Sequence, residues 1–389
     1  MPLALEGIKI LDMCWIGPGA FCSEMLGDLG ADVIKISDVQ MERIGALPKM
    51  VFDNYPGLRN CRTMGLDLKA EAGRQVFYDL ANTADVLMEG FRPGVVKRLG
   101  VDYDTIKAIN PRIVYTSLSS YGQDGPYRDI VGHDVNYLAV SGLLGVTGPK
   151  GGKPIIPGAV VADWAGAMCA STGILAALMS RERTGKGQFV DVSITDAITE
   201  VTSMQINPYL YQRGEPPKKS DTIFSGHYPW YNVYETKNGK YISIATLEPK
   251  FFANLCRLLD GEEFIPHQYD EGEKQEEMFS FFREKFLTKT RDEWMDLLMY
   301  KDTCFTPVYD IDELEFDSQL IARKMILEFD HPAAGCLKQI GSMHKLSDSP
   351  VEVRNVVTRF GQHTAEILAE IGYDSNSIDA LGGAGVISR

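Results

Sequence analysis

The sequence predicts an α/β protein with a large domain built on a mostly parallel sheet and a smaller α+β domain. Its 389 residues exceed the usual single-domain length of about 100–200 residues. Short apolar segments alternate with helical segments over the first 120 residues. A hairpin pattern follows a charged, proline-rich stretch near residue 213, and this change of pattern indicates a second domain.

The alternation begins with a β-α-β unit. Residues 8–13 and 31–36 are predicted strands, and a helix over 20–29 joins them after the turn Gly17-Pro18-Gly19. The same alternation continues with predicted helices at 71–81, 94–99 and 103–109 and predicted strands at 86–88 and 113–117. Because strands that alternate with helices form parallel sheets covered on both faces, the large domain is expected to be Rossmann-like.

The glycine turn at 17–19 imitates the start of a dinucleotide-binding G-x-G-x-x-G motif. Cys22 stands where the third glycine would be, and Pro18 removes one backbone donor. The match is therefore only weak evidence for nicotinamide binding.

The second half of the chain predicts a long helix, a linker and a hairpin. A helix runs to about residue 183 with Asp163 as its N-cap or first-turn acid, and strand 189–194 and a helix from residue 196 follow. RGEPPKKS at 213–220 is a predicted linker. Beyond it come strands at 228–236 and 240–245 around a Lys-Asn-Gly turn, and amphipathic helices at 249–260 and 272–299. We therefore expect residues 1–215 in the large domain and residues 225–310 in the small one.

Composition narrows the classes of partner. A net charge of −14 disfavours general binding to nucleic acid and to anionic membranes. The seven cysteines form no Cys-x-x-Cys pair, which predicts no metal site and no disulfide framework. No cationic leader precedes an apolar segment and no apolar run approaches the ~20 residues of a membrane span, so we expect a cytoplasmic protein.

Four side chains are candidates for chemistry. His133 is the first histidine of the chain and lies beside an apolar run, where a histidine is usually structural. Asp134 and Asp163 suit helix caps, and Glu248 ends a strand just before a proline-started helix. The pattern alone leaves the structural and the catalytic interpretations open for each residue.

A family pattern is spread along nearly the whole chain. It comprises GADVIKI at 30–36, a basic segment at 59–62 leading to LDLK at 66–69, DVLMEGFRPGVVKRLG at 85–100, NPRIVYTSLSSYGQDGP at 110–126, RERTGKGQFVDVSITDA at 181–197 and KDTCFTPV at 301–308. In these segments the sequence resembles the class III CoA-transferase superfamily of the CaiB/BaiF type. GHDVNYLAVSG at 132–142, ADWAGA at 162–167 and ATLEPKFF at 245–252 look like its α-methylacyl-CoA racemase branch. Transferase relatives usually carry an aromatic residue at the position of His133, so this histidine discriminates between the branches.

The resemblance implies a racemase or epimerase of 2-methyl-branched acyl-CoA thioesters. His133 and Asp163 would be the acid/base pair on opposite faces of the α-carbon, with Glu248 as partner of the histidine. Backbone N–H groups at a helix start would stabilise the enolate oxygen. The alternative is a CoA-transferase in which Asp163 attacks the thioester and forms an aspartyl-CoA thioester.

The resemblance also implies the remaining partners. An acidic protein must meet the phosphates of CoA locally, and Lys35, Arg62 and Arg92 lie in the matching segments, while Tyr137 would line the acyl pocket. No cofactor is expected, since CoA is part of the substrate. The family architecture implies an interlocked homodimer, in which residues 320–389 return to the large domain and Glu248 acts on the partner's site.

Overall fold

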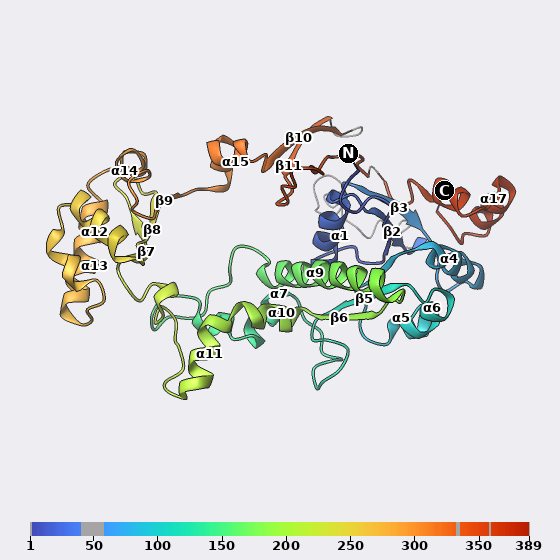
Figure 1. The fold of residues 1–389 in the computed structure, drawn as a ribbon, viewed down its shortest axis with the longest axis horizontal. Coiled ribbons are helices and arrows are strands. Elements are labelled where there is room, and N and C mark those ends of the chain that lie inside the picture. Colours follow the sequence, from blue (N-terminus) through green and yellow to red (C-terminus); the bar gives the residue numbers. More distant parts are fainter. Residues whose placement is uncertain (1, 40–57, 332–334, 358, 389) are drawn as a thin grey trace. The chain divides into compact units, whose positions relative to one another are not determined.

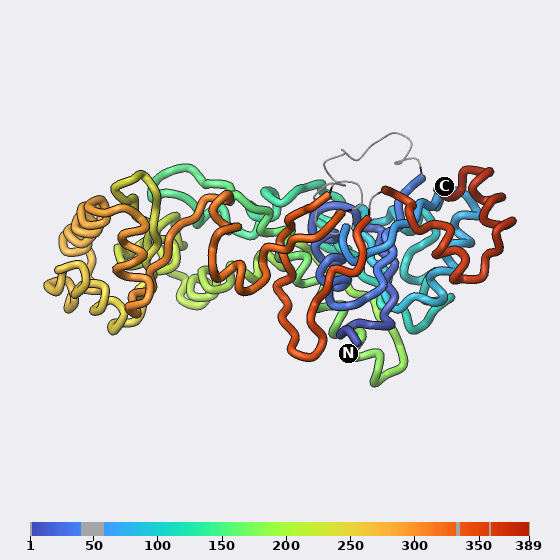
Figure 2. Tube along the Cα trace, turned by 90° about the horizontal axis from the view of Figure 1, so that it is seen from above, coloured from blue at the N-terminus to red at the C-terminus, as the bar shows by residue number. Residues whose placement is uncertain are grey.

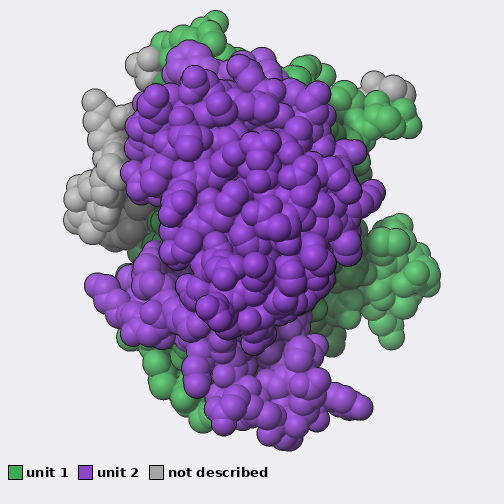
Figure 3. Space-filling view, turned by 90° about the vertical axis from the view of Figure 1, so that its left-hand side faces the viewer, with its two compact units in different colours: residues 1–141, 157–201, 322–389 green, residues 142–156, 202–321 purple. Residues whose placement is uncertain are grey.

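The structure is a computed structural model that describes residues 2–39, 58–331, 335–357 and 359–388. The chain divides into two compact units, coloured separately in Figure 3. Unit 1 comprises Met1–Ser141, Pro157–Val201 and Ala322–Arg389, and unit 2 comprises Gly142–Ile156 and Thr202–Ile321. The expected large domain ran on to residue 215, whereas here residues 142–156 and 202–215 fall into unit 2.

Unit 1 is built on a six-stranded sheet in the order β3-β2-β1-β4-β5-β6, and every described pairing in it is parallel (Figure 1). Its strands are β1 (Lys9–Asp12), β2 (Asp32–Ser37), β3 (Cys61–Gly65), β4 (Val86–Glu89), β5 (Val114–Ser119) and β6 (Phe189–Ser193). Helices in the same part of unit 1 are α1 (Pro18–Asp28), α4 (Glu71–Thr83), α5 (Val95–Leu99), α6 (Tyr103–Ile109), α7 (Asp134–Val140), α9 (Val161–Thr184) and α10 (Ile194–Val201). This strand order is that of the Rossmann fold, as the alternation predicted.

The central strands are buried, which explains their continuous apolar sequences. Leu11, Ile34 and Leu87 are fully buried in one core cluster, against which the apolar stripe of α4 packs. The chain passes from β1 outward to β2 and β3 and then returns to β4 on the other side of β1. Such a reversal leaves a crevice at the carboxyl ends of β1 and β4, where ligands of open α/β sheets bind.

Helix α9 crosses from β5 to β6 and packs against both strands and against α1. Among the described residues it is the one helix long and apolar enough to cross a membrane, with 44% of the relevant window buried. Its small residues, such as Ala167, Ala170 and Ala177, lie against the sheet and α1, so packing accounts for its apolar character.

The C-terminal segment returns to the start of the chain within unit 1. It contains the hairpin β10 (Ile326–His331) and β11 (Gly335–Ile340), then α16 (Thr364–Glu370) and α17 (Ser375–Gly383). Two isolated bridges, Arg59 to Val356 and Leu66 to Ile387, join it to the region around β3, and Figures 1 and 2 show its red trace beside the blue strands. The domain of the large sheet is therefore discontinuous in sequence.

Unit 2 contains a three-stranded antiparallel sheet in the order β7-β8-β9, formed by β7 (Tyr231–Glu235), β8 (Tyr241–Ala245) and β9 (Phe305–Val308). Its helices are α8 (Leu143–Val146), α11 (Ser203–Gln212), η1 (Ile223–Ser225), α12 (Pro249–Leu258), η2 (Glu262–His267), α13 (Glu273–Phe286), α14 (Arg291–Leu298), η3 (Ile311–Phe316) and most of α15 (Ser318–Ala322). The core of unit 2 is aromatic, with Trp230, Phe252, Phe282 and Trp294 buried.

The single helix expected over 272–299 is wrong, because the chain breaks between α13 and α14. Thr290 accepts the backbone N–H of Glu293 through its hydroxyl oxygen, and Glu293 accepts the N–H of Thr290 at 2.8 Å. This reciprocal capping box starts a new helix.

Candidate active site

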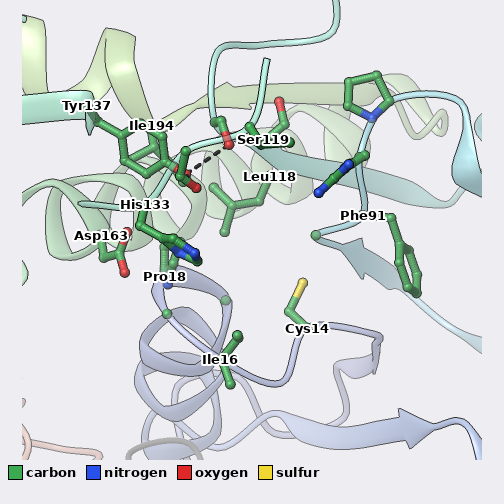
Figure 4. Close-up of a pocket in the computed structure, with 18 of the residues that line it drawn as sticks. Cys14, Ile16, Pro18, Phe91, Leu118, Ser119, His133, Tyr137, Asp163 and Ile194 are labelled. Atoms are coloured by element: carbon green, nitrogen blue, oxygen red, sulfur yellow. Dashed lines mark hydrogen bonds between the residues drawn. The ribbon is translucent and has the colours of Figure 1, made fainter. Parts of the chain in front are cut away.

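A pocket of about 1220 Å³ lies at the carboxyl ends of β1, β4 and β5, all within unit 1. It is lined by residues that follow each of these strands and by the first turns of α7 and α9, including residues 13–19, 90–93, 118–120 and 128–133. Figure 4 shows His133, Asp163 and Tyr137 among the side chains around it. The pocket therefore occupies the crevice that the strand order predicts.

His133 stands immediately before α7, as the N-cap residue of that helix. Its backbone N–H donates to Asn136 Oδ1 at 3.0 Å, and this contact fixes the start of the helix. The residue is exposed and lines the pocket. An imidazole held there at the pocket wall can exchange protons with a bound ligand.

Asp163 lies in the first turn of α9 and is not its N-cap, which is Val160. The carboxylate is half-buried and lines the same pocket as His133. Burial and then the charge of Asp134 raise the pKa of Asp163 to about 6, against a smaller opposite effect of His133. A carboxyl group that titrates there can both accept and donate a proton near neutral pH.

Asp134 was expected to be a cap of its own helix, but it caps the neighbouring one. Its Oδ2 accepts the backbone N–H of Ala162 at 2.8 Å and that of Asp163 at 3.1 Å. The N-cap Val160 has no side-chain acceptor, so α7 supplies the missing group to α9. These two N–H groups of α9 are consequently engaged and do not stabilise a ligand oxygen.

The glycine turn that imitated a nucleotide motif forms part of the pocket wall. Gly17 has a φ of +60°, and a Cβ added to it would lie 3.0 Å from Asp163 Oδ2. A Cβ on Gly19 would lie 2.1 Å from Cys14 Cβ. The two glycines thus let α1 begin tightly against the β1 loop and leave room for the Asp163 carboxylate.

Tyr137 lines the pocket with its ring buried in the first turns of α7. Its hydroxyl lies 2.8 Å from Ser120 Oγ and 2.5 Å from the carbonyl oxygen of Gly132, to which it donates. These bonds tie the loop before His133 to the end of β5. The contacts give Tyr137 a supporting position behind the histidine.

Three arginines lie at the pocket: Arg92, which the sequence indicated, and Arg98 and Arg128, which sequence reasoning missed. Arg92 and Arg98 are exposed. A Cβ on Gly94 would lie 3.8 Å from both Arg98 Nη1 and Arg128 Nη2, so these two guanidinium groups lie near the same glycine. Arg128 pairs with Asp129, which also lines the pocket, at 2.9 Å. In a protein of net charge −14, the remaining local excess of positive charge forms a site for an anionic ligand.

The structure gives the other two expected CoA ligands different partners. Lys35 is 1% exposed, and its ammonium donates to Asp12 Oδ2 at 2.6 Å and to the carbonyl of Cys14 at 2.9 Å. Arg62 donates to Asp32, Glu366 and Glu370, which join β3 to β2 and to α16. Neither Lys35 nor Arg62 lines the pocket, so the proposed CoA-binding site includes neither residue.

Glu248 belongs to unit 2, where it ends the loop after β8 and is the N-cap of α12. Its backbone carbonyl accepts the N–H groups of Phe251 and Phe252, while its side chain makes no cap hydrogen bond and is exposed. The carboxylate is therefore available to another group. Its partnership with His133 stays a prediction.

Glu89 is a buried acid at the end of β4 that sequence reasoning missed. It is 2% exposed, accepts the backbone N–H of Phe91 at 2.8 Å and accepts the hydroxyl of Ser117. Burial outweighs these hydrogen bonds and raises the pKa of Glu89 to about 7. The group supports the strand end from which the chain continues to Arg92.

Glu89→Gln is expected to remove a pH-dependent part of the stability. The unfolded carboxyl titrates near 4.5, whereas the folded one titrates near 7, so the folded state binds more protons and its stability falls as pH rises through this window. We expect the stability of the variant relative to wild type to rise by roughly 2–3 kcal/mol between pH 5 and pH 8. Urea unfolding at both pH values measures it. Glu200→Gln, on the exposed side of α10, is the control, and an equal slope in wild type and Glu89→Gln would contradict the assignment.

Within the described residues, no group of three His, Cys, Asp or Glu side chains is placed to hold a metal ion. The charged or titratable groups that line the pocket include the imidazole of His133, the carboxyl groups of Asp163 and Asp129, and three guanidinium groups. This set can transfer protons or attack a carbonyl next to an anion-binding surface.

Comparisons with known proteins identify the family of the chain. The family model CoA-transferase family III matches residues 5–364. The human alpha-methylacyl-CoA racemase is 31% identical, with 97% of this chain and 96% of that protein covered, and the human succinyl-CoA:glutarate CoA-transferase is 30% identical, with 99% and 90% covered. A crystal structure of a CaiB/BaiF family protein from Brucella suis matches with a TM-score of 0.81 at 25% identity, covering 95% of this chain and 100% of that one. On the family match and these full-length similarities, the chain belongs to CoA-transferase family III.

Proposed function

We propose that the protein is a racemase or epimerase of 2-methyl-branched acyl-CoA thioesters. The observation that supports this most is the presence of His133 and Asp163 in one pocket, with the pKa of Asp163 raised to about 6. A carboxyl group with this pKa can accept and donate a proton near neutral pH, which suits proton transfer in both directions.

In the proposed reaction, neutral His133 removes the α-proton from one face of the thioester. The electron pair moves onto the thioester oxygen and forms an enolate. Protonated Asp163 then delivers its proton to the opposite face of the α-carbon, which inverts the centre and leaves an imidazolium and a carboxylate. The reverse direction starts from that state, with Asp163 as the base and His133 as the acid.

The enolate oxygen needs hydrogen-bond donors where its charge develops. The first N–H groups of α9 at Ala162 and Asp163 are engaged by Asp134. The first N–H groups of α7, at Asp134 and Val135, have no intrahelical acceptor by position and adjoin His133. We propose that these N–H groups, next to the pocket-lining His133, bind the enolate oxygen.

The three arginines would bind the phosphates of CoA. Arg92→Ala is expected to raise KM for the acyl-CoA by about 10- to 30-fold with little change in kcat, because a charge-assisted contact of about 1.5–2 kcal/mol remote from the α-carbon is lost. Steady-state kinetics measure both constants. Arg183→Ala, an exposed arginine in the last turn of α9, is the matched control. An unchanged KM for Arg92→Ala would exclude the guanidinium as a CoA ligand.

A CoA-transferase is the second candidate, which the similarity to a transferase supports at nearly the same identity. Here the Asp163 carboxylate attacks the thioester carbonyl, and the CoA thiolate leaves to give a mixed anhydride. The thiolate then attacks the aspartyl carbonyl and releases the acid, which leaves an aspartyl-CoA thioester for the acceptor acid. This route uses the Asp163 carboxylate and needs no imidazole.

Incubation in heavy water with one 2-methylacyl-CoA epimer distinguishes the two reactions. The racemase incorporates deuterium at the α-carbon and interconverts the epimers without any added acid, which proton NMR and chiral separation detect. CoA exchange that requires an added carboxylic acid, without α-deuteration, would favour the transferase. Absence of both reactions would exclude both proposals.

We further propose a homodimer in which Glu248 acts on His133 of the other copy. Large apolar side chains exposed on α7, α9 and α10 are compatible with such an interface: Val140, Trp164, Met179 and Val201. Co-expression of His133→Ala and Glu248→Ala chains tests the arrangement, since only mixed dimers then contain one complete site. Failure of the mixture to exceed either variant alone would exclude action between chains.

A cytoplasmic location also stays a proposal. All seven cysteines are thiols outside any disulfide, and four of them are buried, as suits a reducing compartment. Cell fractionation with an antibody against the native protein tests this, and recovery in an organelle or membrane fraction would contradict it.

A further inference from the structure

Asp134 connects the two helices that carry the proposed acid/base pair. It lies next to His133 in sequence and begins α7, while its Oδ2 accepts the N–H groups of Ala162 and Asp163 at 2.8 and 3.1 Å in the first turn of α9. A single oxygen atom thus anchors the backbone of Asp163 to the helix that begins beside His133. The side chain of Asp134 itself is not among the groups that line the pocket.

The surroundings of Asp163 make this contact important electrostatically as well as sterically. Within the described part of the chain, the titratable groups that interact with Asp163 include Asp134, His133 and Tyr137, all on or beside the first turns of α7. From the turn before α1, the uncharged Gly17 lies beside the carboxylate. Asp134 therefore supplies the nearby negative charge that favours the protonated form of Asp163.

We propose that Asp134 is a positioning residue, whose carboxylate fixes the separation of His133 and Asp163 by joining the start of α7 to the start of α9. Proton transfer at the two faces of one carbon tolerates little change in this separation, because misplacement by about 1 Å can cost about 10²-fold in rate. The inference rests on the proposed function of the pair, but the clamp itself is a property of the fold.

Two variants separate the geometric effect of Asp134 from its charge. Asp134→Asn keeps an oxygen that can accept the α9 N–H groups but removes the charge, while Asp134→Ala removes both. We expect Asp134→Ala to lower kcat by about 10²-fold with little change in KM for the acyl-CoA. Asp134→Asn should keep kcat within about tenfold of wild type. The limb of its pH profile that belongs to Asp163 should move to lower pH, because the charge that holds the proton on Asp163 is gone.

The matched control is Asp196→Asn, which alters an exposed first-turn aspartate of α10 outside the pocket. Thermal unfolding of all three variants verifies that they are folded. A readout independent of turnover is the carbon-13 NMR titration of labelled aspartate carboxyl groups, with the Asp163 signal identified by its loss in Asp163→Asn. The Asp163 signal should titrate at lower pH in Asp134→Asn than in wild type.

Equal losses in Asp134→Asn and Asp134→Ala, with the Asp163 titration unchanged, would overturn the proposal. If wild type shows no α-deuteration, the racemase proposal fails, while the NMR titration still reports whether the charge of Asp134 acts on Asp163. If wild type is a racemase and Asp134→Ala keeps the kcat of wild type, the clamp proposal fails alone.

Discussion

His133→Ala is expected to abolish interconversion of 2-methylacyl-CoA epimers, with a fall in kcat of about 10²–10⁴-fold and a nearly unchanged KM. The imidazole is the proposed acid/base group on one face of the α-carbon, and both directions of inversion need it. The variant keeps the arginines at the pocket and the Asp163 carboxyl group, so substrate binding should persist. Chiral separation of the products after incubation with each pure epimer measures the loss.

The pattern of deuterium incorporation distinguishes the two proposed bases more directly than the loss of rate does. With Asp163 alone, the epimer whose α-proton faces the carboxylate can exchange that proton for deuterium and recover it on the same face. His133→Ala should therefore deuterate one epimer slowly without inverting it, and Asp163→Asn should deuterate the other. Opposite stereochemical preferences of the two variants would be hard to explain by anything except groups on opposite faces.

The matched control is His267→Ala, which removes an exposed histidine of η2 in unit 2 that pairs with Asp270. Its inversion rate should equal that of wild type. If His133→Ala keeps full inversion, or if both active-site variants deuterate the same epimer, the two-base mechanism is wrong. Survival of acid-dependent CoA transfer in His133→Ala together with its loss in Asp163→Asn would identify a transferase.

The sheet could be predicted from sequence because its strands are buried on both faces and read as short apolar runs between helices. The predicted strand at 31–36 and the predicted helix at 71–81 differ from β2 and α4 by one or two residues at their ends. The break at Thr290 was also present in the sequence, as a threonine followed three residues later by Glu293. The long amphipathic pattern on either side of it concealed the break.

The site was harder to predict from the sequence than the sheet was, because residues that are far apart in the sequence form its contacts. Gly17 and Asp163 are far apart in the sequence, and only the fold brings them together. From the sequence alone, the turn at Gly17 therefore resembled an incomplete nucleotide-binding motif, and its role beside the Asp163 carboxylate was not visible. Arg98 and Arg128 have the sequence pattern of ordinary solvated charges, since only the fold brings both of them close to Gly94. A charge in a sequence gives its sign but not its partner.

Lys35 is a charged residue whose partner could not be identified from the sequence. Its motif suggested a phosphate ligand, but pairing of β1 with β2 brings it into register with Asp12. Burial works against the ammonium, but the negative charge and hydrogen bond of Asp12 outweigh it, so the pKa of Lys35 is raised. Asp12 also accepts the hydroxyl of Ser23 and the backbone N–H of Cys14, which completes a buried polar cluster beneath the pocket.

Lys35→Met is therefore expected to destabilise the fold by about 3–5 kcal/mol, because it leaves Asp12 buried without its cation. Urea unfolding measures the loss, and KM for the acyl-CoA should stay near the wild-type value in the folded fraction. The double variant Asp12→Leu with Lys35→Met should recover much of the stability, since an apolar pair has no charge to desolvate. Lys186→Met, at an exposed lysine, should change the stability by less than about 0.5 kcal/mol. A Lys35→Met variant of normal stability and greatly raised KM would instead make Lys35 a ligand of CoA and would mean that the lysine leaves Asp12 when substrate binds.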